Sequence, residues 1–395
     1  MTPAARHQAA IEVLDRIGSG EPAEAALTRW ARGARYAGSG DRAAVRDLVF
    51  TVLRRWRSLA ALGGDETGRG RILGLLRESG TDPAEVFTGQ GHAPAPLSPT
   101  EISAGTDPDP DQALDLPDWL IPIWRDALGR DAATIARALR DRAPVMVRVN
   151  LRKTDRATAI TTLAEAGILA EPVAISPTAL RITEGARRLA ASPAYLAGLV
   201  ELQDGASQAI VDEVYLASDR SILDFCAGGG GKTLALAARS DAVILAHDHN
   251  PQRMADLPAR ASRAGARIDI LAGDALDARA PFDLVLADAP CSGSGAWRRA
   301  PEARWRLTQA ALDQLTRTQD AILARAATLV APDGRLAYAT CSVLDCENDA
   351  RVDAFLAAHD GWCALSRRNW HPGAEGDGFY LAILSRTCGK GQPQR

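Results

Sequence analysis

The feature that most constrains this chain is a regular alternation of short apolar segments and helical segments over its second half. Apolar segments separated by helices of about 10 to 20 residues predict a parallel, doubly wound sheet with helices on both faces. We therefore predict an α/β protein with a Rossmann-like sheet, whose ligands would bind beyond the carboxyl ends of the strands. Strands are expected at 221–225, 242–247, 268–271, 282–287 and 335–339, followed by two late strands near 362 and at 379–384.

The first half of the chain has a different pattern and predicts additional domains. Residues 1–87 carry apolar side chains at helical spacing, which indicates a small all-helical domain. Residues 88–118 are rich in Pro and acidic residues, so we expect a linker that buries too little apolar surface to offset its ordering entropy. Residues 119–200 are predicted to form a small α+β module, and residues 201–388 the sheet domain.

Composition argues against several classes of protein. No apolar run approaches the roughly 20 residues of a membrane span, and no apolar signal core follows the amino terminus, so a cytoplasmic protein is expected. The chain of 395 residues has six cysteines, and none forms a Cys-x-x-Cys pair. We therefore expect neither a disulfide scaffold nor a metal site.

The turn after the first strand of the sheet, from Asp224 to Thr233, reads Asp-Phe-Cys-Ala-Gly-Gly-Gly-Gly-Lys-Thr. A P-loop would need Gly in place of Cys226, and a dinucleotide fingerprint would need Gly in place of Thr233, so both patterns fail. Asp248 follows the second strand and could accept hydrogen bonds from ribose hydroxyls. Asp274 follows the third strand and could accept one from an adenine amine. One Asp at a strand end is more often a turn former, but three beside a glycine turn favour an adenosine cofactor without phosphates.

Two cysteines follow later strands of the sheet. Cys291 comes after the strand that ends near Asp288, and Cys341 comes after the next strand. Because adjacent parallel strands are about 5 Å apart, the two thiols can face one pocket. A free cysteine is most often a small buried hydrophobic residue, whereas a converging pair beside an acid indicates chemistry.

These motifs resemble those of a known family. Asp-Ala-Pro-Cys at 288–291, Thr-Cys-Ser at 340–342 and Gly-Lys-Thr at 231–233 are similar to the signatures of the Sun (Fmu) family of RNA cytosine-C5 methyltransferases. The stretch 376–380 also resembles that family's final hairpin. The resemblance implies a class I methyltransferase sheet, S-adenosyl-L-methionine as cofactor and RNA as partner. The helical amino-terminal region is similar to the NusB-like RNA-binding domain of bacterial members.

The resemblance also implies roles for single residues. Cys341 would be the nucleophile that adds to cytosine C6, and Cys291 would remove the C5 proton and release the product. Asp288 would hydrogen-bond the cytosine edge, and Lys232 would contact the base or lower a thiol pKa. The family's turn usually has Ala-Pro where this chain has Gly228 and Gly229, which leaves the turn less pre-organised. The expected cofactor-binding residues are Cys226, Ala227, Gly228, Gly229, Gly230, Gly231, Lys232, Asp248, Asp274 and Asp288.

A stretch that follows Cys291 mixes tryptophan with arginine. Such mixtures stack unpaired bases and hold phosphates. We therefore predict RNA contacts at Trp297, Arg298 and Arg299, and at Arg54 and Arg55 in the helical region. The alternative is a core tryptophan with surface arginines.

Together, the sequence favours an enzyme that forms 5-methylcytosine in RNA, with small-subunit (16S) ribosomal RNA as the expected substrate and a monomer as the expected state. A non-catalytic RNA-binding or ribosome-assembly protein on the same fold is the alternative, and intact Asp288, Cys291, Lys232 and Cys341 argue against it. A DNA cytosine methyltransferase is a third candidate, which the second thiol and the basic helical region disfavour.

Overall fold

The computed structural model describes residues 1–214, 216 and 219–387, so the predicted domain boundary at 388 lies outside the described residues. The chain divides into two compact units. Residues 1–142 with 297–307 form the first unit, and residues 143–296 with the chain from 308 onward form the second. Within the described ranges, no helix is both long and apolar enough to cross a membrane.

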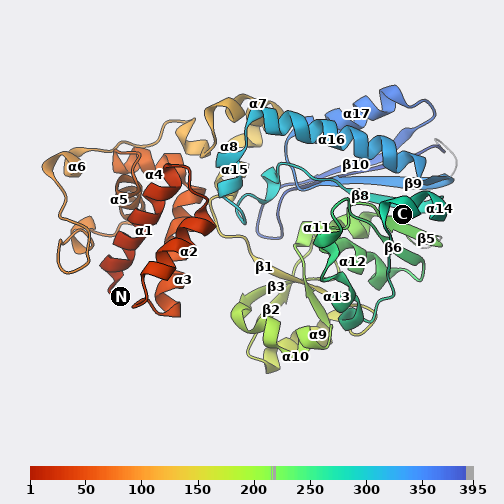
Figure 1. The fold of residues 1–395 in the computed structure, drawn as a ribbon, viewed down its shortest axis with the longest axis horizontal. Helices are drawn as coiled ribbons and strands as arrows, with labels where there is room; N and C mark the ends of the chain where they lie inside the picture. The colour runs from red at the N-terminus through yellow and green to blue at the C-terminus, as the bar shows by residue number, and fades with distance from the viewer. Residues whose placement is uncertain (215, 217–218, 388–395) are drawn as a thin grey trace. The chain divides into compact units, whose positions relative to one another are not determined.

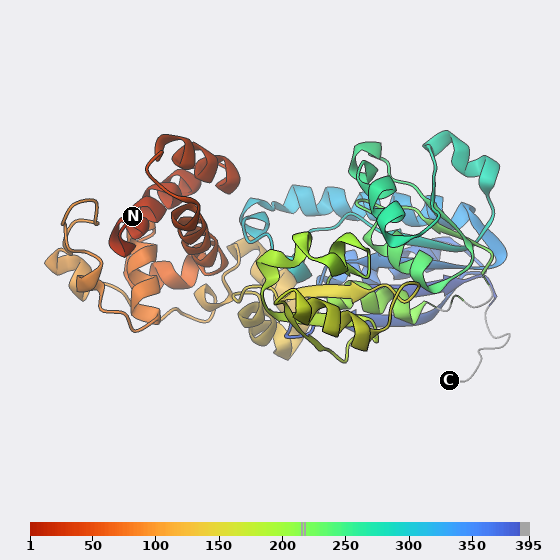
Figure 2. The same ribbon diagram turned by 90° about the horizontal axis from the view of Figure 1, so that it is seen from below.

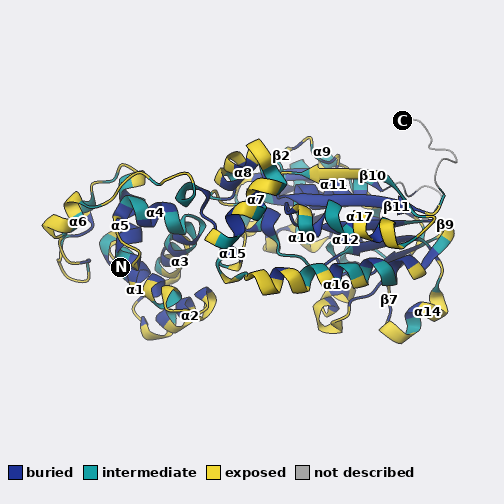
Figure 3. Ribbon diagram, turned by 90° about the horizontal axis from the view of Figure 1, so that it is seen from above, coloured by how far each residue is buried: buried dark blue, intermediate teal, exposed yellow. Residues whose placement is uncertain are grey.

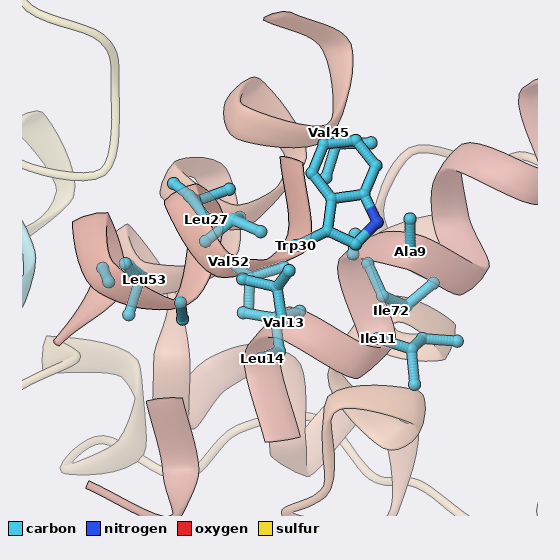
Figure 4. Packing of buried hydrophobic residues seen from close by; sticks show 14 of the residues in the cluster. Ala9, Ile11, Val13, Leu14, Leu27, Trp30, Val45, Val52, Leu53 and Ile72 are labelled. Atoms are coloured by element: carbon cyan, nitrogen blue, oxygen red, sulfur yellow. The ribbon is translucent and has the colours of Figure 1, made fainter. Parts of the chain in front are cut away.

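Five helices, red to orange in Figures 1 and 2, make up the larger part of the first unit. They share one apolar core, in which Leu14, Val52 and Ile72 are fully buried (Figure 4). A Cβ on Gly74 would lie 2.0 Å from the Leu59 carbonyl oxygen, so two of the helices touch through their backbones. The helices that the apolar spacing predicts in this region are therefore present. They are α1 (Pro3–Gly18), α2 (Ala23–Gly33), α3 (Ser39–Arg54), α4 (Trp56–Gly63) and α5 (Gly68–Glu78).

Residues 88–118 are not a free linker, and that prediction is wrong. The segment contains a short helix, α6 (Pro99–Ser103), and buries Leu116 completely. Asp115 is also fully buried; it accepts hydrogen bonds from the backbone N–H groups of the first turn of α4 and pairs with Arg140 at 2.9 Å. The prediction counted only apolar surface, whereas polar bonds hold this segment in place, among them those that Arg77 donates to four carbonyl oxygens.

Residues 119–142 lie in the first unit, although the sequence predicted that they open an α+β module. They form α7 (Ile121–Leu128) and α8 (Ala132–Ala138), and residues 297–307 add α15 (Glu302–Arg306). Trp124 explains the grouping, because its indole donates to the Ala132 carbonyl and its ring stacks on that of Trp297 at 6.1 Å.

The second unit begins with a four-stranded antiparallel sheet in the order β2-β3-β1-β4. Val147, Leu163 and Leu180 are fully buried in the core between this sheet and its helices. The strands are β1 (Val145–Val149), β2 (Leu169–Pro172), β3 (Ala179–Glu184) and β4 (Val200–Leu202), and the helices are α9 (Arg156–Glu165) and α10 (Pro193–Leu196).

The larger sheet of this unit has seven strands in the order β10-β11-β9-β8-β5-β6-β7. The five strands from β9 to β7 in this order are parallel, as predicted. The sheet as a whole is mixed, because β11 runs antiparallel to both β9 and β10. The strands are β5 (Ser221–Asp224), β6 (Val243–Ala246), β7 (Asp269–Ile270), β8 (Phe282–Asp288), β9 (Val330–Thr340), β10 (Cys363–Trp370) and β11 (Phe379–Ser385).

Helices cover both faces of the seven-stranded sheet (Figure 1). Apolar residues of α16 and α17 pack on one face, and those of α11 and α12 on the other. Buried strands and the exposed outer side of α16 are visible in Figure 3. Because β5, β6, β8 and β9 are parallel, their carboxyl ends lie at one edge of the sheet, where the functional residues were expected. The helices are α11 (Gly205–Glu213), α12 (Gly231–Arg239), α13 (Leu257–Ala264), α14 (Leu276–Arg279), α16 (Gln309–Thr328) and α17 (Asp349–Ala358).

Candidate active site

The two predicted cysteines meet at the carboxyl ends of β8 and β9. The backbone pairing of these strands continues to Ala289, whose N–H donates to the Ala339 carbonyl at 2.9 Å. This register places Cys291 and Cys341 opposite each other, with their Sγ atoms 3.3 Å apart. Both thiols are half-buried and unoxidised. A pocket at this edge would thus present two sulfur atoms to one substrate.

The two thiols have unequal surroundings. The hydrogen bond with Cys341 and burial raise the pKa of Cys291 well above its usual value. Cys291 therefore holds its proton more firmly than an ordinary thiol, and either sulfur atom can be the donor in the contact between them. The contact fits either sulfur as the nucleophile, so the role of Cys341 stays a prediction.

Lys232 and Asp288 form an ion pair beside the thiols. Lys232 Nζ lies 2.7 Å from Asp288 Oδ2, and the lysine side chain is only 7% exposed. Burial alone would lower the pKa of Lys232, but Asp288 and other nearby anionic groups offset this effect, so the pKa lies above its usual value. The ammonium also faces the Phe379 ring at 4.9 Å. Lys232 is thus a fixed cation at the strand ends, as a functional lysine would be.

The glycine turn between β5 and α12 closes on Asp248. Gly228 has φ +53°, a conformation that glycine adopts without strain. Its N–H donates to Asp248 Oδ2 at 2.9 Å, and Arg253 donates to the same oxygen at 3.1 Å. The guanidinium of Arg260 donates to the Gly229 carbonyl, so a side chain restrains the turn at the position where the related family has proline.

Asp224 lies beneath this turn at the end of β5 and is nearly fully buried. Thr233 Oγ1 donates to Asp224 Oδ2 at 2.7 Å, while Asp224 Oδ1 has no hydrogen-bond partner. Burial raises the pKa of Asp224 to about 7. An unpaired buried oxygen and a turn without side chains fit a polar ligand that approaches the backbone, as the predicted adenosine cofactor would.

Three other predicted cofactor residues have distinct environments. Ala227 is buried in the turn, and burial raises the pKa of Cys226, which suits a packing role for that thiol. Asp274 lies on an exposed turn after β7. Its contact with a cofactor stays a prediction. No cluster of residues suited to hold a metal ion occurs in the part of the chain that the structure describes.

Sequence reasoning missed Glu347, which lies under the two thiols. Its side chain is completely buried and accepts hydrogen bonds from Ser292 and Ser342, the residues that follow Cys291 and Cys341. An acid just before α17 has the pattern of an ordinary helix start, so local sequence gives no signal for this role.

The predicted RNA contacts at Trp297 and Arg298 are wrong for this structure. Trp297 is 1% exposed and Arg298 is 3% exposed, both within the first unit. Arg54 donates to the Arg298 carbonyl at 2.8 Å, and Arg55 pairs with Glu78 at 2.5 Å, so both have internal partners. Arg299 is exposed, and its contact with RNA stays a prediction.

Comparisons with known proteins match most of the chain to one family of methyltransferases. A family model described as 16S rRNA methyltransferase RsmB/F matches residues 214–384, and a second, for a ferredoxin-like domain of the RsmF/B-like methyltransferases, matches residues 116–187. Ribosomal RNA small subunit methyltransferase B of Cronobacter sakazakii is 33% identical over 288 residues, which are 67% of this chain and 66% of the relative. The matched segment therefore spans slightly less than two thirds of that relative.

Solved structures share the fold. The protein PH0851 matches 98% of this chain and 99% of its own, with a TM-score of 0.73 at 22% identity. NSun6 from Pyrococcus horikoshii, solved with SFG, matches 68% of this chain and 98% of its own, with a TM-score of 0.60 at 17% identity. At these identities the likeness supports a class I methyltransferase fold and nothing finer.

Proposed function

Because the chain belongs to the RsmB/F (Sun/Fmu) family of methyltransferases, we propose that it methylates cytosine C5 in small-subunit (16S) ribosomal RNA, with S-adenosyl-L-methionine as cofactor. The observation that carries this proposal is the pair of thiols 3.3 Å apart at the ends of β8 and β9. Methylation at C5 by this route requires one sulfur that adds to C6 as a nucleophile and a second that removes the C5 proton.

The cofactor would lie against the glycine turn and supply the methyl group. Asp248 is placed to receive ribose hydroxyls, and exchange of its Arg253 contact for those hydroxyls would leave the buried carboxylate paired. The unpaired Asp224 Oδ1 offers a second acceptor in the same place. The protein thus contributes two acceptors, and the glycines of the turn add no side chains of their own.

Cys341 would begin the reaction on the base. Cytosine C5 is a weak nucleophile, and a C6–S bond formed by the Cys341 thiolate moves the electron pair of the C5=C6 bond toward N3. C5 then has enamine character and can accept the methyl group. Asp288, oriented by Lys232, would hydrogen-bond the base edge and favour a proton at N3.

Cys291 would end the reaction. After methylation, the Cys291 sulfur takes the C5 proton, the C5–H electron pair restores the C5=C6 bond, and the C6–S bond breaks to free Cys341. Cys291 must release its own proton to solvent before this step, because only the thiolate can accept the C5 proton. The cytoplasmic location and monomeric state expected from the sequence remain predictions.

Methyl transfer from labelled S-adenosylmethionine to 16S RNA tests the proposal. We expect the wild-type chain to transfer label, Cys341→Ala to be inactive, and Cys291→Ala to accumulate a covalent protein–RNA adduct on a denaturing gel. Cys346→Ala, at a free cysteine outside the pair, is the control and should retain activity.

The other outcomes are informative. An adduct with Cys341→Ala instead would exchange the two roles. A wild-type chain that binds RNA but transfers label to no RNA would favour the non-catalytic RNA-binding protein, and label that enters only DNA would favour a DNA methyltransferase.

A further inference from the structure

One buried carboxylate joins the residues that directly follow the two cysteines. Ser292 donates to Glu347 twice, from its N–H to Oε1 at 2.8 Å and from its hydroxyl to Oε2 at 2.5 Å. The Ser342 hydroxyl donates to the same Oε2 at 2.6 Å. Glu347 is 0% exposed. Its two oxygens therefore hold together two loops that arrive from different strands.

A fourth donor extends this connection to α16. Gln319 Nε2 donates to Glu347 Oε1 at 3.0 Å and to the Pro290 carbonyl at 2.9 Å. All four bonds to the carboxylate come from neutral groups. A buried carboxylate is costly unless such bonds saturate it, so the energy of this charge depends on both loops being in place.

The loop after Cys341 is fixed from a second side as well. Asn348 donates to the Ser342 carbonyl at 3.0 Å and accepts from Thr340 Oγ1 at 2.6 Å. Ser294 Oγ lies 2.8 Å from Ser342 Oγ. The backbone before and after Cys341 is thus held, and Glu347 sets its position relative to the loop that carries Cys291.

We propose that Glu347 is a positioning residue that sets the spacing of the two reactive sulfur atoms. It lies under the thiols and acts through Ser292 and Ser342. Its effect on turnover rests on the function proposed above, whereas its effect on sulfur spacing does not. Since misplacement of reacting groups by about 1 Å can reduce a rate about 100-fold, release of this contact should reduce turnover strongly.

Glu347→Gln is the sharpest test, because it preserves shape and removes one acceptor. An NH2 group at the Oε1 position faces the Ser292 N–H, which can only donate, and one at the Oε2 position forces both serine hydroxyls to turn from donors into acceptors. We expect kcat for methyl transfer to fall about 10- to 100-fold while KM for S-adenosylmethionine changes less than about threefold.

A second measurement reads sulfur spacing without RNA. Diamide removes the two thiol hydrogens and is itself reduced to a hydrazine while one S–S bond forms between Cys291 and Cys341. We expect this disulfide, quantified by peptide mapping, to form at least about fivefold more slowly in Glu347→Gln, because the effective concentration of one sulfur near the other falls. If wild type transfers no methyl group, the proposed function fails and this rate still tests the positioning role.

Asp283→Asn is a matched control. Asp283 also joins two strands, by accepting from the N–H groups of Arg220 at 2.8 Å and Ser221 at 3.0 Å, but at the opposite ends of β5 and β8. It should lower stability without changing the disulfide rate. If Glu347→Gln does not fold, Ser292→Ala combined with Ser342→Ala removes two hydroxyl donors to the same oxygen. A disulfide rate within twofold of wild type in the folded variant, or an equal loss in Asp283→Asn, would overturn the proposal.

Discussion

Residues 288–295 and 297–307 are neighbours in sequence, yet they serve different parts of the molecule. The first stretch carries Cys291 at the strand ends of the second unit, whereas the second packs inside the first unit. The small residues of the first stretch allow its backbone to form hydrogen bonds, such as the one that Gly295 N–H donates to the Cys341 carbonyl. In the second, Arg304 is fully buried and donates to the carbonyl oxygens of Asp115 and Leu139. The difference shows that a stretch rich in Trp and Arg can be buried, with an arginine donating hydrogen bonds to backbone carbonyl oxygens.

The largest effect should come from Trp297→Ala. The indole is 1% exposed and stacked on Trp124, so its loss leaves a cavity and should lower the stability of the first unit by about 3–5 kcal/mol. Hydrogen exchange of residues 1–142 measures this. Trp370→Ala, at a half-buried position in β10, is the control and should have a smaller effect. If Trp297→Ala kept its stability but bound RNA more weakly, Trp297 would be an RNA contact after all.

Two buried cations sharpen the comparison. Arg304→Met removes the donors to two buried carbonyls and a charge near Asp115, and should lower the stability of the first unit by roughly 3 kcal/mol while the folded protein keeps its turnover.

Lys232→Met leaves only the partly exposed Asp288 unpaired, and should reduce kcat/KM about 100-fold with a smaller loss of stability. Urea unfolding and methyl transfer on both variants measure the two effects. If both variants lost mainly stability, Lys232 would be a structural residue.

The sequence predicted the parts of the fold that depend on local pattern. Apolar segments ending in polar residues located β5, β6, β8 and β9, and therefore placed both thiols at one edge. Glu347 was not predictable, because its partners lie in loops whose approach depends on strand register. Trp297 was misread because its burial depends on Trp124, which is far away in sequence. The segment 88–118 was misread because side-chain bonds to its backbone, such as those from Arg77, have no sequence period.

A further effect, one of pH, should come from Asp224 in the second unit. Its pKa rises from 3.8 in the reference state to about 7, so the native state binds the proton more tightly. Its contribution to stability is complete below about pH 4, decreases by a few kcal/mol as the pH rises to about 7, and is absent above that. Asp224→Asn should flatten this slope, which urea unfolding at about pH 5 and about pH 8 measures. An unchanged slope would show that Asp224 is ionised in the native state throughout this range.

The smallest effect on stability should come from Arg299→Ala. Arg299 is exposed, in contrast to its neighbours Trp297 and Arg298, so its removal should change the unfolding free energy by less than about 0.5 kcal/mol. If Arg299 is the residue of this stretch that meets the phosphate backbone, its loss should weaken RNA binding several-fold and reduce the salt dependence of binding by about one charge. Filter binding of 16S RNA at two salt concentrations measures both, with Arg317→Ala, on the exposed side of α16, as a control of equal charge. Equal weakening by the two variants would mean that the RNA senses only net charge, and the stretch 297–307 would then be structural throughout.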